Sequence, residues 1–122
     1  MLTDYNNQTT FMKTDPVEIF QTIRATLQPY ATLGFSNREN SDEVYDLWSN
    51  INVEIGDNQR SETFFASVNL LEGEVVLKTG FSHHIQGGEK TLTIASLDDI
   101  LLNQIEDAMA AGYKTFKEKE WV

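Results

Sequence analysis

Residues 62–95, ETFFASVNLLEGEVVLKTGFSHHIQGGEKTLTIA, decide the fold. Apolar and polar residues alternate along this stretch, and two turn signals, Glu72-Gly73 and Gly87-Gly88, interrupt it. Alternation with a period of two is typical of a strand with one buried face, and a two-residue turn with glycine joins antiparallel strands. The stretch therefore predicts three antiparallel strands, over residues 62–71, 74–85 and 90–95.

The two turns also predict which residues face each other across the strands. A two-residue loop at Glu72-Gly73 places Val68 opposite Leu77, and one at Gly87-Gly88 places Phe81 opposite Ile94. Both loops put their apolar residues on the same face, whereas a one-residue shift would invert every side chain. The other pairs predicted on this face are Leu70–Val75, Ala66–Thr79, Phe64–Phe81 and His83–Leu92.

The segment before this stretch, residues 42–55, fits both a helix and a strand. The helical spacing is carried by Val44, Leu47, Trp48 and Ile51, and the alternation by Tyr45, Leu47, Ile51, Val53 and Ile55. Asn50, Asn52 and Glu54 are polar and favour a strand from about Leu47 onward, preceded by a helical turn at residues 42–46. A turn at residues 56–60 and a short strand at residues 32–36, with Leu33 and Phe35 on one face, complete the predicted sheet.

A helix is predicted on each side of the sheet-forming segment. Asp15-Pro16-Val17-Glu18 has a capping residue, a proline suited to the first turn and an acid three residues after the cap. Pro29 ends this helix near Leu27. A second helix begins around Ser96-Leu97-Asp98-Asp99, and Gly112 either terminates it or is a close-packing position. The apolar faces are Pro16, Phe20, Ile23, Leu27 and Tyr30 in the first helix, and Leu97, Leu101, Ile105, Ala108 and Met109 in the second.

These elements predict an α+β fold, an antiparallel β-meander of four to five strands packed on one face by an N-terminal and a C-terminal helix. A length of 122 residues fits a single domain spanning residues 1–122. Residues 1–13 are polar, and we expect them to form a mobile or edge segment. The order of one helix, a meander and one helix is similar, at the level of the fold alone, to small acidic dimeric secretion chaperones.

Composition excludes several classes of protein. The chain has no cysteine, which excludes a disulfide framework and a thiolate metal site. Its longest apolar runs, such as Val75-Val76-Leu77, fall far short of the ~20 residues that cross a membrane. A net charge of −10 repels phosphate groups and disfavours direct binding to nucleic acid or anionic lipid. We therefore expect a soluble, cytoplasmic protein without a membrane anchor.

No residue pattern predicts a catalytic, cofactor or metal site. His83-His84 is the pair closest to such chemistry, but adjacent residues of a strand point to opposite faces and cannot hold one ion. No cysteine or third histidine completes a ligand set. We predict that the protein is not an enzyme and takes no cofactor.

The second face of the sheet is the predicted partner-binding surface. Phe65, Leu71 and Val76 lie on it in the predicted register, and Trp48 is placed beside them. Apolar residues on a face without a covering helix are typical of a binding surface. The candidate partner-binding residues are Trp48, Phe65 and Val76, and the predicted function is that of an adaptor or chaperone-like homodimer that binds another protein.

Two other functions fit the sequence. The first is a domain that binds a small ligand in a pocket between the sheet and the C-terminal helix. The second is an acidic mimic of nucleic acid, of the kind that a mobile element encodes, because 19 acidic and 9 basic residues give a strongly negative surface.

Overall fold

The computed structural model describes residues 12–51, 53–55, 58–60 and 63–122; of residues 53–55 and 58–60 it describes the backbone alone. The elements are, in chain order, β1 (Met12–Lys13), α2 (Pro16–Leu27), the 3-10 helix η1 (Gln28–Thr32), β2 (Phe35–Ser36), β3 (Val44–Ser49), β4 (Val53–Ile55), β5 (Asn58–Arg60), β6 (Thr63–Leu71), β7 (Glu74–Thr79), the 3-10 turn η2 (Ile85–Gly87), β8 (Thr91–Ile94), β9 (Leu97–Asp98) and α3 (Asp99–Glu118).

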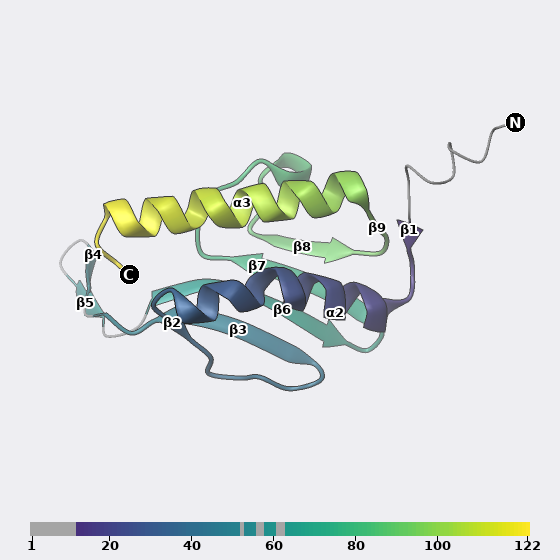
Figure 1. The fold of residues 1–122 in the computed structure, drawn as a ribbon, viewed down its shortest axis with the longest axis horizontal. Coiled ribbons are helices and arrows are strands. Elements are labelled where there is room, and N and C mark those ends of the chain that lie inside the picture. Colours follow the sequence, from purple (N-terminus) through teal and green to yellow (C-terminus); the bar gives the residue numbers. More distant parts are fainter. Residues whose placement is uncertain (1–11, 52, 56–57, 61–62) are drawn as a thin grey trace, which may run out of the picture.

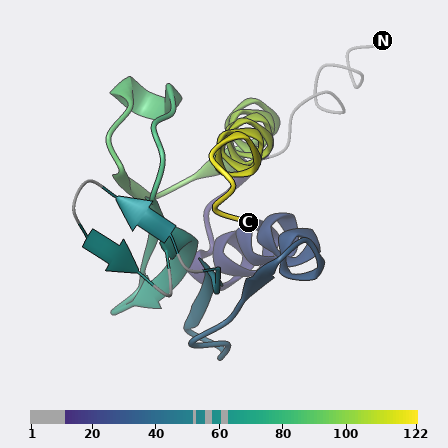
Figure 2. The ribbon, with the colours of Figure 1, turned by 90° about the vertical axis from the view of Figure 1, so that its left-hand side faces the viewer.

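The fold is α+β, as predicted. Five antiparallel strands form one sheet in the order β2-β3-β6-β7-β8, and β4 with β5 and β1 with β9 form two separate pairs. The helices α2 and α3 lie side by side over one face of the sheet (Figure 1). The view along the helices shows the same two layers (Figure 2). The apolar core lies between these layers.

The predicted β6–β7 hairpin is confirmed from Ala66 opposite Thr79 to the turn, and β7 ends at Thr79 instead of residue 85. Val68 faces Leu77, and Leu71 faces Glu74 across a two-residue turn. Glu72 and Gly73 both have positive φ, 52° and 79°. A tight turn with positive φ at both central residues matches the right-handed twist of the strands that it joins.

The predicted register between β7 and β8 is wrong. Ile94 faces Val75 instead of Phe81, and Leu92 faces Leu77 instead of His83. The chain between the two strands contains the turn η2, which Gly88 caps. Gln86, Gly87 and Gly88 all have positive φ, so Gly87 and Gly88 do not form a two-residue loop. The shift is six positions, an even number, so Leu92 and Ile94 still point into the core.

A bulge in β6 overturns the predicted placement of two phenylalanines. Leu47 of β3 faces Ala66, but the next residue, Trp48, faces Phe64, so Phe65 has no residue directly opposite on β3. An extra residue in one strand lets two successive side chains reach the same face. Phe65 and Ala66 are therefore both fully buried, and Phe64 points to the other face beside Trp48.

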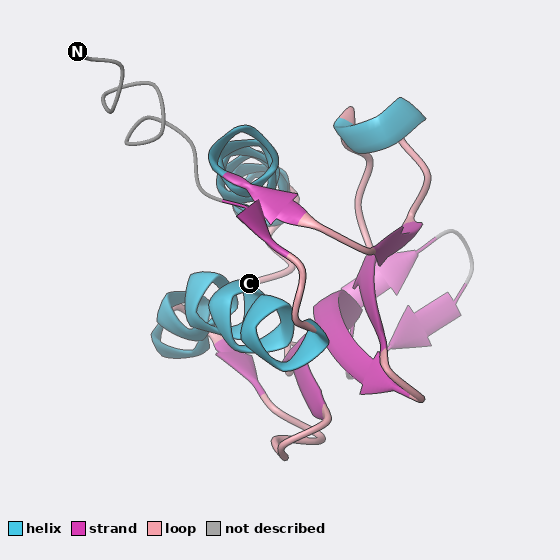
Figure 3. Ribbon diagram, turned by 90° about the vertical axis from the view of Figure 1, so that its right-hand side faces the viewer, coloured by secondary structure: helices cyan, strands magenta, loops and turns pink. Residues whose placement is uncertain are grey.

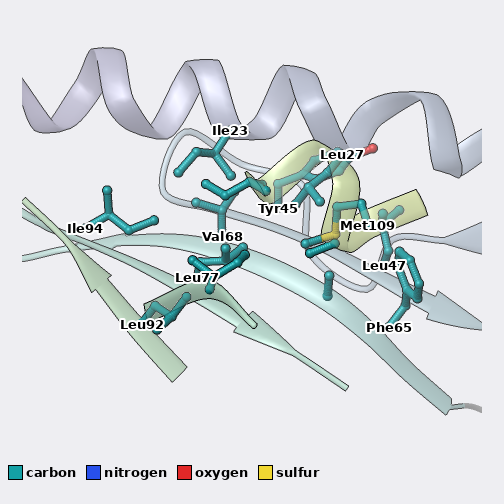
Figure 4. Packing of buried hydrophobic residues seen from close by; sticks show 14 of the residues in the cluster. Ile23, Leu27, Tyr45, Leu47, Phe65, Val68, Leu77, Leu92, Ile94 and Met109 are labelled. Carbon is teal, nitrogen blue, oxygen red and sulfur yellow. The ribbon is translucent and has the colours of Figure 1, made fainter. Parts of the chain in front are cut away.

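Phe65 accordingly lies in the core, not on the open face where the alternating pattern places it. Its ring centre is 5.0 Å from that of Phe81, so the predicted Phe64–Phe81 pair is a Phe65–Phe81 contact. Figure 4 shows Phe65 among the other core side chains.

The segment from residue 32 to residue 60 differs from the predicted pattern in three places. Strand β3 begins at Val44, so the predicted helical turn at residues 42–46 is wrong. The predicted strand at residues 32–36 is limited to Phe35–Ser36, with Phe35 buried and Leu33 exposed. Residues 58–60 form β5, which pairs with β4, where a turn was predicted at residues 56–60; residues 56–57 lie outside the described part.

The helices begin and end close to the predicted positions. Helix α2 starts at Pro16 and ends at Leu27, as predicted. The N-cap of α3 is Asp98 instead of Ser96, and its carboxylate accepts a hydrogen bond of 2.8 Å from the Leu101 amide. Met12 and Lys13 pair with β9, so this part of the predicted mobile or edge segment is an edge strand, and residues 1–11 lie outside the described residues.

Gly112 lies inside α3 and is the close-packing position, not the helix terminator. A Cβ atom built on Gly112 would be 2.7 Å from carbon atoms of the Phe81 ring. The missing side chain lets the start of the loop between β7 and β8 pack directly on the helix. The predicted apolar stripe is buried at Ile105, Ala108 and Met109.

Candidate functional site

The outer face of the five-stranded sheet, opposite the two helices, is the predicted partner-binding surface. The strand register places Trp48, Phe64 and Val76 on this face, and each is half-buried. Leu71 also lies on this face and is exposed, as predicted. No described helix covers the face (Figure 2). Of the predicted partner-binding residues, Trp48 and Val76 are on the outer face and Phe65 is not.

Trp48 belongs to a group of three side chains that we call the aromatic–arginine cluster: Arg38, Trp48 and Phe64. The ring centres of Trp48 and Phe64 are 5.1 Å apart. The guanidinium carbon of Arg38 lies 4.1 Å from the centre of the indole ring. A cation at this distance over an indole is attracted to the negative face of the ring.

Asp46 holds the loop that carries Arg38. Asp46 is buried, with a relative exposure of 8 %, although the strand register puts its side chain on the outer face. One carboxylate oxygen accepts hydrogen bonds from the amides of Arg38 and Glu39, at 2.7 and 3.0 Å. The side-chain amide of Asn37 donates to the carbonyl oxygen of Asp46. These bonds fix residues 37–39 against β3 and place the Arg38 side chain over Trp48.

We expect Asp46→Ala to destabilise the protein by about 1–3 kcal/mol, because two amides near the sheet lose their acceptor. The amides of Arg38 and Glu39 should then exchange with solvent faster, as measured by hydrogen exchange. Asp42→Ala removes an exposed carboxylate from the same loop and should leave both exchange rates unchanged. Equal effects of the two substitutions would mean that Asp46 does not anchor the loop.

Val76 is separated from the cluster by a polar row. Its neighbours across the strands are Asn69 and Thr93. The row between Val76 and Phe64 contains Ser67 and the exposed Lys78. The outer face is therefore mixed, with an aromatic end and a predominantly polar centre.

The predicted pair His83-His84 lies in the loop between β7 and η2, not in a strand. His83 is buried and His84 is exposed. The amide of Ile85 donates a hydrogen bond of 3.1 Å to Nδ1 of His83, so in the neutral ring Nε2 carries the hydrogen. Burial lowers the pKa of His83, and a hydrogen bond with the backbone of Glu89 partly opposes that shift. Nε2 of His83 is itself shielded from solvent.

A cavity of 380 Å³ lies between this loop and α3. The loop contributes the residues Ser82 to Ile85, and the helix contributes one face of four residues. His83 and Asp107 therefore line the same space, although they are far apart in the sequence. The sequence pattern does not predict that His83 and Asp107 lie close together, because this depends on the path of the loop between β7 and β8.

Within residues 12–51, 53–55, 58–60 and 63–122, no three His, Asp or Glu side chains lie close enough together to hold a metal ion. The described helices also include none that is long and apolar enough to cross a membrane. Comparison of the chain with protein-family models, with curated proteins and with solved structures found no match.

Sequence reasoning missed two members of the aromatic–arginine cluster. Phe64 was predicted on the core face because strict alternation does not anticipate a bulge. The Phe64-Phe65 pair was the available signal, since two adjacent phenylalanines cannot both obey a period of two on one face. Arg38 is in a loop, where no periodicity indicates the direction of a side chain.

Proposed function

We propose that the protein is a non-enzymatic, cytoplasmic interaction protein that forms a homodimer through the outer face of its sheet and binds another protein as an adaptor or chaperone. The observation that carries this proposal is the aromatic–arginine cluster on a sheet face that no described helix covers. Tryptophan and arginine are the residues most enriched among those that dominate the binding energy of protein interfaces.

The charged residues of the outer face favour a second copy of the chain as the partner that binds there. Lys78 is exposed on this face, although the chain carries 19 acidic and only 9 basic residues. Glu74 lies on the same face of β7, beyond Val76, and is also exposed. A two-fold contact pairs each patch with its own copy, so Lys78 of one protomer would meet the acidic groups of the other.

The net charge opposes this association. Two copies with a charge of −10 each repel one another, and added salt screens that repulsion. Burial of the aromatic side chains is insensitive to such screening. The proposed dimer therefore tightens as ionic strength rises.

We expect sedimentation analysis to show a dimer that Trp48→Glu weakens by roughly tenfold to a hundredfold, which corresponds to the ~1.5–3 kcal/mol gained by burying a large apolar side chain. The matched control is Leu33→Glu, which puts the same charge on an exposed apolar residue between η1 and β2 and should leave the dimer unchanged. Lys78→Glu, at an exposed site that does not threaten folding, should also weaken the dimer.

A monomer at every ionic strength would contradict the homodimer. A dimer that Trp48→Glu and Lys78→Glu leave intact would show that another surface carries the contact. Circular dichroism of each variant establishes that it is folded.

A further inference from the structure

A groove lies between the two helices, on the side of the sheet that they cover. The helices α2 and α3 lie beside each other there, as the end-on view shows (Figure 3). The groove has a volume of 700 Å³ and is lined by residues of α2, η1 and α3 together with Leu33. It shares no residue with the aromatic–arginine cluster or with the cavity near His83.

The wall that α2 contributes is short and offers no free hydroxyl hydrogen. Ala25 of α2 and Ala110 of α3 both line the groove and are exposed. The hydroxyl of Thr22 donates to the carbonyl oxygen of Glu18 at 2.8 Å, and that of Thr26 donates to the carbonyl oxygen of Thr22 at 3.2 Å. A hydroxyl has one hydrogen to donate, so both threonines of this wall use theirs within the helix.

Two tyrosines, Tyr30 of η1 and Tyr113 of α3, supply the aromatic surface of the groove. Both are half-buried, and their ring centres lie 5.7 Å apart with 56° between the planes. Core rings hold them in place: Tyr30 is 5.7 Å from Phe65, and Tyr113 is 6.2 Å from Phe35. The two rings are therefore positioned before a ligand binds, which lowers the entropic cost of binding.

The charge of the groove comes from Glu106, the only charged side chain among the described residues that line it. Glu106 acts on the same region as the two rings. The pKa of the Tyr30 hydroxyl is raised, first by burial and then by the negative charge of Glu106 and by the nearby Tyr113. The groove thus combines two tyrosine rings and one carboxylate, without a lysine or arginine among its described lining residues.

We propose that this groove binds a small ligand that carries a quaternary ammonium group. The positive charge is attracted to the faces of the Tyr30 and Tyr113 rings and to the Glu106 carboxylate. A primary ammonium has three N–H donors to satisfy, whereas a quaternary ammonium has none and presents methyl groups that pack against rings and alanines. The net charge of −10 attracts such a cation to the protein.

The proposal is tested with choline, followed by NMR. The amide chemical shifts of Tyr30, Ala110 and Tyr113 should change on titration and should saturate. The matched probe is the neutral carbon analogue of choline, in which a tert-butyl group replaces the trimethylammonium group without changing the shape. It should bind about tenfold more weakly, because it loses the attraction to the rings and to the carboxylate. Ethanolamine, a primary ammonium with the same hydroxyl group, should also bind more weakly than choline.

Four variants locate the site. Tyr113→Leu removes one ring and should weaken choline about tenfold, whereas Tyr113→Phe keeps the ring and should bind choline like the unchanged protein. Glu106→Gln changes an exposed residue and should weaken choline but not its neutral analogue. Ala110→Leu fills the groove from an exposed helical position, where leucine is well tolerated, and should abolish binding.

Absence of saturable shifts would overturn the proposal, as would choline binding that Ala110→Leu leaves in place. Equal binding of choline and its neutral analogue would exclude recognition of the charge. Equal losses in Tyr113→Leu and Tyr113→Phe would exclude the assigned role of the ring. Trp48→Glu should not alter the titration, so a failure of the proposed dimer and a failure of this site are distinguishable. Circular dichroism of each variant establishes that it is folded.

Discussion

Replacing Phe65 with alanine is expected to lower the free energy of unfolding by about 3–5 kcal/mol, a large part of the stability of a domain this size. Phe65 is completely buried and lies at the centre of a group of aromatic rings. Its ring centre is 4.3 Å from that of Phe35, 5.2 Å from Phe116 and 5.7 Å from Tyr30. The substitution removes these contacts and leaves a cavity. Unfolding in urea, followed by circular dichroism, measures the loss.

Phe64→Ala is the matched control, because it makes the same change one residue earlier. Phe64 is half-buried on the outer face and loses only part of its contacts, so we expect a destabilisation of about 1 kcal/mol. Equal losses at the two positions would show that β6 has no bulge. A larger loss at Phe64 would restore the strictly alternating register.

The second large effect is expected at Ile105, whose side chain is fully buried at the centre of α3. Ile105→Ala should cost about 2–5 kcal/mol, from lost apolar contact and the cavity that remains. Ile100→Ala makes the same change in the first turn of the helix, where the side chain is 69 % exposed, and should cost less than ~0.5 kcal/mol. Denaturant unfolding of both variants gives the comparison.

A loss below ~1 kcal/mol at Ile105 would mean that α3 docks on the sheet through another face or frays from it. A similar loss at both isoleucines would have the same meaning. Either result would also remove the helix from the wall of the cavity near His83.

The sequence predicted the hairpin of β6 and β7 because two independent signals agree there. The alternation of residues 63–71 and 74–79 defines a buried face, and Glu72-Gly73 fits a two-residue turn between them. Hydrophobic pattern and turn geometry then select one register. The start of α2 was predictable from Pro16, which suits the first turn; Asp15 is the N-cap residue, but its side chain makes no capping hydrogen bond.

The β7–β8 connection was not predictable because a pair of glycines specifies a turn without specifying its length. Gly87 and Gly88 do adopt positive φ, but Gln86 joins them and the connection extends back to Gly80. Gly80 itself is packed so closely on the Phe64 backbone that a Cβ atom would be 2.1 Å from its carbonyl oxygen. Tertiary contacts of this kind end β7 at Thr79, and the local strand propensity of the sequence does not indicate them.

The candidate site residues were likewise predictable in regular strands and unpredictable in loops and at the bulge. Trp48 and Val76 were placed on the outer face because each lies in a regular stretch of strand. The bulge moved Phe65 off that face and put Phe64 on it, because one extra residue reverses the alternation at the start of β6, before the part that keeps the predicted register. The cavity near His83 depends on the path of a loop and on Gly112, both of which are settled by packing between distant segments.

The strand order β2-β3-β6-β7-β8 has a kinetic consequence. Each strand of the sheet pairs with the strand that precedes it in the sheet along the chain, and the longest connection, between β3 and β6, contains the β4–β5 hairpin. Closing short loops costs little conformational entropy, so the sheet can assemble step by step as a set of local pairings. The pairing of Met12–Lys13 with Leu97–Asp98 joins segments far apart in the chain and closes the largest loop. It is therefore expected to form late in folding, after the meander is in place.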